Sequence, residues 1–126
     1  MRWWCWLVIV FGAVLVGAAC DLTDGPAVAL MRWMGRAPID ATPPLRFAVG
    51  LMGAVTLGWG ASLLAVAATS DALAPDLRVI LWRRIGWAVL AWFTIDSIVS
   101  IATGFWPNAV SNTVLLAAFF AAARRV

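Results

Sequence analysis

Two stretches of the chain, residues 3–20 and 47–70, contain no charged side chain. About 20 consecutive apolar residues in a helix cross the hydrocarbon core of a bilayer. The composition agrees, because hydrophobic residues make up 64% and charged residues 12% of the 126 residues, whereas soluble proteins average about 45–50% and about 25%. A soluble fold of this composition would lack the polar surface to cover itself. The sequence therefore predicts an all-α integral membrane protein.

Two further apolar segments complete a predicted four-helix bundle. We expect the third span at residues 79–105 and the fourth at residues 109–123, with a tight turn at 106–108. The fourth span is short, about 22 Å at 1.5 Å per residue, so a re-entrant segment is its alternative. The whole chain, residues 1–126, then forms a single transmembrane domain.

The only substantial polar connection, residues 21–46, separates the first two spans. Asp24 followed by Gly25 and Pro26 is typical of a helix start. The residues that follow supply an apolar surface with arginines at intervals, as in a helix that lies in the headgroup region. We therefore expect a short interfacial helix at residues 25–35, with an irregular loop as the alternative.

The arginines give the bundle an orientation. Four spans place both termini and the 71–84 turn on one side of the membrane, and this side holds most of the arginines. Because arginine-rich connections stay in the cytoplasm, we expect a multi-pass protein of a bacterial inner membrane with cytoplasmic N- and C-termini. A cleaved signal sequence is the alternative for residues 3–20. The first side holds Arg2, Arg78, Arg83, Arg84, Arg124 and Arg125, and the second holds Arg32, Arg36 and Arg46.

Tryptophans gather at both predicted membrane interfaces, as an aromatic belt does. Two of them, Trp59 and Trp92, fall near the predicted midplane instead. Buried packing or a ligand pocket would account for these two. The interfacial tryptophans are Trp3, Trp4, Trp6, Trp82 and Trp87 on the cytoplasmic side, and Trp33 and Trp106 on the outer side.

The absence of His, Lys, Glu and Tyr removes several classes of catalytic site. Without His there is no imidazole base and no histidine-ligated metal, and without Lys there is no Schiff-base chemistry. We therefore predict no metal and no cofactor, and we favour a protein that is not an enzyme. The net charge of +3 does not indicate a nucleic-acid partner, because the arginines lie at helix ends where they orient the chain in lipid.

Asp96 is the only acidic residue inside a predicted span. An ionised carboxylate at membrane depth costs about 2.5–3.5 kcal/mol on insertion scales, so it needs partners. We expect Arg46 to supply the counter-charge and Ser100 or Asn112 to complete the hydrogen bonds. The site is either a proton, cation or headgroup site or a polar clasp between helices. The candidate polar site consists of Asp96, Arg46, Ser100, Thr103, Asn108 and Asn112.

Small residues recur every four positions along the second predicted span. Such a ridge lets another helix approach closely, and contact with lipid alone is the alternative. The predicted helix-packing face consists of Gly50, Ala54, Gly58 and Ser62.

These features leave three classes of function open. The favoured one is a non-enzymatic accessory, assembly or structural subunit of the membrane, because the chain carries little catalytic equipment. The second is an oligomeric small transporter or channel that uses Asp96. The third is a lipid- or quinone-binding membrane enzyme or sensor. The expected partners are the lipid bilayer and either further copies of the chain or a larger membrane complex.

Overall fold

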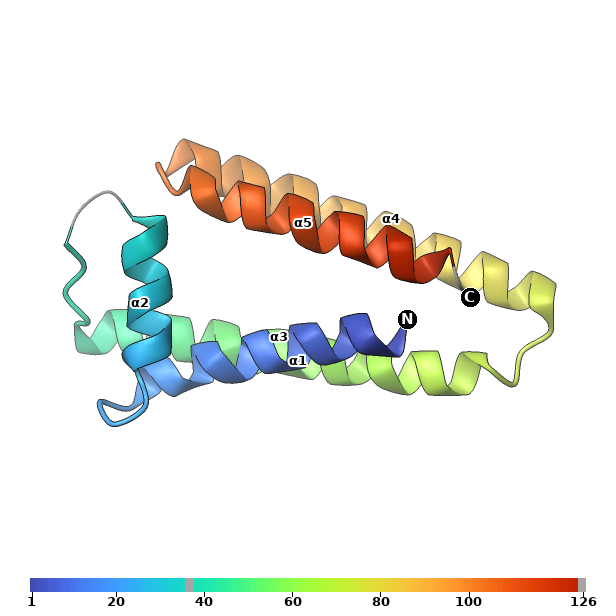
Figure 1. The fold of residues 1–126 in the computed structure, drawn as a ribbon, viewed down its shortest axis with the longest axis horizontal. Helices are drawn as coiled ribbons and strands as arrows, with labels where there is room; N and C mark the ends of the chain where they lie inside the picture. The colour runs from blue at the N-terminus through green and yellow to red at the C-terminus, as the bar shows by residue number, and fades with distance from the viewer. Residues whose placement is uncertain (36–37, 125–126) are drawn as a thin grey trace. The chain divides into compact units, whose positions relative to one another are not determined.

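The computed structural model describes residues 1–35 and 38–124, and every regular element in these ranges is a helix. The all-α prediction is therefore confirmed. Two of the arginines used for the orientation, Arg36 and Arg125, lie outside the described residues. The elements shown in Figure 1 are α1 (Arg2–Val16), the 3-10 helix η1 (Gly17–Ala19), α2 (Gly25–Met34), α3 (Pro43–Ser70), α4 (Pro75–Ala102) and α5 (Trp106–Ala123).

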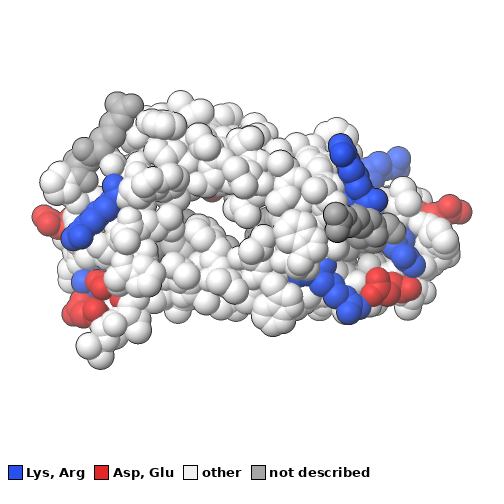
Figure 2. Space-filling view, in the orientation of Figure 1, with Lys and Arg blue, Asp and Glu red and all other residues white. Residues whose placement is uncertain are grey.

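Three helical segments are long and apolar enough to cross a membrane, which supports a membrane protein by length and composition. Helix α5 is outside this group, because Asn108, Ser111 and Asn112 make its first turns polar. Figure 2 shows charged atoms near helix ends and uncharged atoms over the middle of the helices on the visible face. The three segments are Arg2–Ala19, Pro43–Ser70 and Pro75–Ala102.

Prolines lie in the first turns of four helices. The structure places Pro26 at the start of α2, Pro43 at the start of α3, Pro75 at the start of α4 and Pro107 at the start of α5. Proline is tolerated there because the first helical N–H groups have no partner within the helix. As a result α3, α4 and α5 each begin earlier than the expected residues 47, 79 and 109. Helix α3 begins inside the expected polar connection, and α4 and α5 begin inside segments that we expected to be turns.

The connection between α4 and α5 is a three-residue turn centred on Gly104. Gly104 has φ +84°, a left-handed conformation that favours glycine. The Phe105 N–H donates to the Ser100 carbonyl at 2.7 Å, and the Gly104 N–H donates to the Ile101 carbonyl at 3.1 Å. This pair of bonds is a Schellman motif, which satisfies the last carbonyls of α4 and reverses the chain. The two helices therefore pack as an antiparallel hairpin.

The chain consists of two compact units, which we describe separately. The α4–α5 unit contains the residues from Val66 onward together with residues 1–4, and the α1–α3 unit contains Cys5–Ala65. In the α4–α5 unit, the indole N–H of Trp4 donates to the Leu115 carbonyl at 3.0 Å. The Trp4 ring also meets Phe119 edge to face, with centroids 5.2 Å apart. The first turn of the chain is thereby attached to α5.

In the α1–α3 unit, glycines bring α1 and α3 into backbone contact. A Cβ atom added at Gly12 would lie 2.5 Å from the Leu57 nitrogen, and one added at Gly53 would collide with the Val16 nitrogen. One added at Gly60 would lie 2.9 Å from the side chain of Ile9. Small residues at these points are what allows such close packing in lipid, where no hydrophobic effect drives helices together.

Helix α2 packs its apolar face onto one end of the α1–α3 pair. Ala27 of α2 is fully buried among Leu15, Ala18 and Val49, with Leu30 and Met31 packed against the same cluster. The side chains of Trp33 and of Leu22, which precedes the helix, remain largely exposed. The predicted helix at residues 25–35 is thus present, and its exposed apolar residues suit a headgroup position.

Candidate functional site

Asp96 accepts hydrogen bonds from side chains on both helices of the α4–α5 hairpin. Its Oδ1 atom accepts from Asn108 Nδ2 at 2.7 Å, from Asn112 Nδ2 at 2.7 Å and from Ser100 Oγ at 3.1 Å. Ser100 is one helical turn after Asp96 on α4, whereas both asparagines project from the start of α5. These four residues form the polar cluster of the hairpin, and the sequence identified all four of them.

Further bonds connect the members of the polar cluster. Asn108 Nδ2 donates a second hydrogen bond to Ser100 Oγ at 2.8 Å. The single Ser100 hydroxyl proton is shared between the Asp96 carbonyl oxygen at 2.7 Å and the more distant Oδ1. Ser100 and Asn112 are buried, with 6% and 4% of their surface exposed. Networks of this kind polarise their members and strengthen each bond where water is excluded. The cluster therefore ties the start of α5 to the last two turns of α4.

Two further hydroxyl groups near the end of α4 lie outside the polar cluster. Thr103, which directly follows α4, was expected in the site, but its Oγ1 donates to the Val99 carbonyl at 2.8 Å. Ser97 Oγ is buried and has no hydrogen-bond partner among residues 1–35 and 38–124. A threonine that bonds to a carbonyl four residues back loses its donor for other contacts, which explains why Thr103 does not reach Asp96.

Arg46 forms its ion pairs with the connection that precedes α2. Its Nη2 lies 2.6 Å from Asp21 Oδ1, its Nη1 lies 2.7 Å from Asp24 Oδ2, and its Nε donates to the Ala41 carbonyl at 2.9 Å. Asp24 is 19% exposed and Asp21 is 85% exposed, so the Asp24 pair is the better shielded from water. Arg46 belongs to the α1–α3 unit, and its pairing with Asp96 stays a prediction.

The ion pairs of Arg46 with Asp21 and Asp24 were not expected from the sequence. Both acids lie in the connection that leads to the second span, and Arg46 stands at the entry to that span. An arginine at a membrane boundary pairs most readily with acids at the same level, where the desolvation cost is smaller. The smaller desolvation cost therefore favours Asp21 and Asp24 as partners of Arg46 over Asp96, which lies inside a predicted span.

Only part of the predicted small-residue face meets another helix within the α1–α3 unit. A Cβ added at Gly50 would lie 3.0 Å from Ala19 Cβ, whereas one added at Gly58 meets nothing within 4 Å. Ala54 and Ser62 are exposed, and the Ser62 hydroxyl donates to the Gly58 carbonyl of its own helix. The close approach of α1 and α3 uses Gly53 and Gly60, so the role of Ala54, Gly58 and Ser62 in packing stays a prediction.

The polar cluster joins α4 and α5 through one carboxylate. The Asn108 and Asn112 amides both donate to Asp96 Oδ1, and the Asp96 carboxylate is the basic group of the cluster. In the described part of the chain, no group of three His, Cys, Asp or Glu side chains is arranged to hold a metal ion. Comparisons with models of protein families, with curated proteins and with solved structures found no match to this chain.

Proposed function

We propose that this chain is a non-enzymatic, multi-pass membrane protein that serves as an accessory, assembly or structural subunit. It has four spans in a bacterial inner membrane, with both termini in the cytoplasm. Its partners are the bilayer and a larger membrane complex or further copies of itself. The small-residue face of Ala54, Gly58 and Ser62 is open on α3, and a face of this kind suits close contact with a partner helix.

The hydrogen bonding of Asp96 carries the proposal. Two amide groups from α5 donate to its Oδ1 atom, and the Ser100 hydroxyl lies 3.1 Å from the same atom. Because each amide N–H presents a partial positive charge toward Oδ1, these groups oppose a cation at the same oxygen. This arrangement supports Asp96 as part of a polar clasp that joins two helices.

The length of α5 supports the fourth span. The helix contains 18 residues, or about 27 Å at 1.5 Å per residue, close to the roughly 30 Å of a hydrocarbon core. The polar residues near its start would be costly in lipid, but the polar cluster pairs Asn108 and Asn112 with Asp96. Arg124 lies at the other end of the helix, where its long side chain reaches the headgroups.

Native mass spectrometry after extraction in mild detergent tests the proposal. The expected result is a complex of defined mass that contains this chain with a different membrane protein or with further copies of itself. A matched extract in a harsher detergent should release the free chain, which separates assembly from aggregation. Recovery of the monomer alone under both conditions would contradict the subunit proposal.

A small oligomeric transporter or channel is the second candidate, and one observation favours it. Asp96 Oδ2 accepts no hydrogen bond from the described residues, and Asp96 is partly exposed. Acids inside membrane spans are commonly functional. Proteoliposomes with the chain and with Asp96→Asn decide between the candidates. Ion or proton flux that the chain supports and the variant abolishes, with both proteins folded, would establish the transporter.

A further inference from the structure

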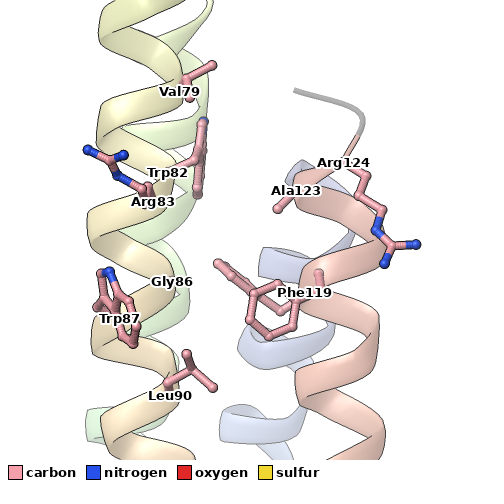
Figure 3. A pocket seen from close by; sticks show the side chains of 10 residues that line it. Val79, Trp82, Arg83, Gly86, Trp87, Leu90, Phe119, Ala123 and Arg124 are labelled. Carbon is pink, nitrogen blue, oxygen red and sulfur yellow. The ribbon is translucent and has the colours of Figure 1, made fainter.

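A pocket lies between α4 and α5 at the end of the hairpin opposite the polar cluster. It has a volume of about 410 Å³, and its walls are mainly apolar. Gly86 contributes no side chain, and a Cβ placed there would still lie 3.8 Å from the Phe119 ring. In Figure 3 the Phe119 side chain extends from α5 toward α4, and Trp82 forms the facing wall. The pocket has the lining and size to take an acyl chain.

Positive charge marks the rim of this pocket. Arg83 of α4 and Arg124 at the end of α5 both line it, and in Figure 3 their guanidinium groups lie on opposite sides of it, each turned away from the space between the two helices. Neither guanidinium forms an ion pair within residues 1–35 and 38–124, and the lining contains no acidic residue. Two guanidinium groups at the mouth of an apolar groove are complementary to a phosphate that is attached to an acyl chain.

Trp82 adds a donor that lacks an acceptor. Its side chain is 6% exposed, and its indole N–H is buried without a hydrogen-bond partner in the described part of the chain. A buried indole normally finds an acceptor. Phosphate and ester carbonyl oxygens of a lipid headgroup are acceptors, and they would lie at the level of Trp82 when the phosphate meets Arg83.

We propose that this pocket binds an anionic phospholipid. The long side chains of Arg83 and Arg124 turn toward the pocket and flank the phosphate, and one acyl chain lies against Gly86, Leu90 and Phe119. The inference goes beyond the proposed function, because it assigns a specific lipid to a surface that a structural subunit does not require. In the proposed topology the lipid comes from the leaflet on the arginine-rich side of the membrane. Basic pockets between membrane helices on that side bind acidic headgroups.

The position of the pocket along α4 fits this occupant. About two helical turns precede Arg83 in α4, and the stretch from Arg84 to Ala102 is about 27 Å long, close to the thickness of a hydrocarbon core. Arg83 therefore falls where the headgroups begin. The residues that would meet the acyl chain follow Arg83 along α4, so they lie deeper in the membrane.

Competitive lipid binding tests the proposal. The full chain is reconstituted in nanodiscs that contain phosphatidylglycerol and phosphatidylcholine with identical acyl chains, and retained lipids are counted by native mass spectrometry. We expect one phosphatidylglycerol per chain to be retained preferentially. Arg83→Gln and Arg124→Gln should each weaken this retention about fivefold, since each basic residue near the membrane contributes a comparable attraction to acidic lipid. Arg84→Gln is the matched control, because Arg84 neighbours Arg83 but does not line the pocket.

The following outcomes distinguish lipid binding at this pocket from a general electrostatic attraction between arginines and acidic lipids. Equal loss with Arg84→Gln and Arg83→Gln, or no preference for phosphatidylglycerol, would overturn the proposal. Gly86→Leu should fill the apolar part and abolish retention while leaving both arginines in place, whereas Gly86→Ala should fold and retain the lipid. If inorganic phosphate alone displaces the lipid at millimolar concentration, the site binds a free anion and the lipid assignment is wrong. A helical circular dichroism spectrum and an unchanged elution volume in size-exclusion chromatography show that each variant is folded.

Discussion

Asn112 has the clearest role of any single side chain in the hairpin. It is 4% exposed and donates to Asp96 Oδ1 at 2.7 Å. It lies deeper in α5 than Asn108, so its amide has fewer alternatives to this bond than an amide at the membrane surface. The Asp96 carboxylate likewise depends on it, because an acceptor in a water-poor site cannot replace a lost donor with solvent.

We expect Asn112→Ala to lower the free energy of unfolding by about 1–2 kcal/mol, because Asp96 loses a donor inside the hairpin. Thr113→Ala is the control, because the neighbouring Thr113 is exposed and its hydroxyl donates only to the Ala109 carbonyl of its own helix. Thermal unfolding in detergent, followed by circular dichroism, measures both variants. Equal stability of the two would show that the polar cluster does not hold the hairpin together.

A double-mutant cycle tests the partners of Arg46. The ion pair with the 19%-exposed Asp24 predicts that Arg46→Gln and Asp24→Asn are coupled by about 0.5–1 kcal/mol. Arg46→Gln and Asp96→Asn should instead add, because each residue already has partners in its own unit. The measurement is the free energy of unfolding of the unmodified chain, the three single variants and the two double variants. A coupling above about 0.5 kcal/mol between Arg46 and Asp96 would establish the ion pair expected from the sequence.

At the scale of elements, the sequence located every helix and misplaced several of their ends. Apolar runs identify spans because lipid imposes one strong requirement, the internal satisfaction of backbone polar groups. The ends of the helices are harder to predict from the sequence, because X-Pro sequences occur both in turns and in the first turns of helices. Pro75 and Pro107 illustrate this, since both were assigned to turns and both lie in the first turn of a helix.

The candidate site shows a similar division. The four members of the polar cluster could be predicted, because helical spacing and an antiparallel hairpin bring them to one level. The glycines that α1 and α3 use for contact could not, because glycine and alanine occur on several faces of α3 and periodicity alone does not select one. The contact through Gly53 depends on the complementary Gly12 in another helix, and a single-helix pattern does not contain that information.

Gly53→Leu should separate α1 from α3, because any side chain at Gly53 collides with the backbone of α1. We expect a loss of at least about 2 kcal/mol of stability, or failure to fold. Gly58→Leu is the matched control in the same helix, since a Cβ there meets nothing within 4 Å. Unfolding curves and oligomer mass in detergent are the measurements. A Gly58→Leu variant that stays stable but changes its oligomer mass would establish the predicted packing face.

At the scale of the whole molecule, the proposed topology gives a direct test. Reporters fused after the last residue and within 71–74 should be active in the cytoplasm, and those within 38–42 should be active in the periplasm. The arginine bias between the two sides is the reason. Arg83→Gln combined with Arg84→Gln lowers the bias from six against three to four against three, which should reduce the fraction in this orientation. A periplasmic C-terminus together with a cytoplasmic 71–74 reporter would show that α5 does not cross.

The bond from Trp4 to Leu115 has a consequence for synthesis. Its two residues are separated by 111 positions, so the ribosome needs roughly 5–20 s to make the second after the first. The first turn of α1 thus receives this contact only after α5 has been synthesised. A chain truncated before α5 lacks the contact, and the first turn of α1 is then held by at least one interaction fewer during insertion.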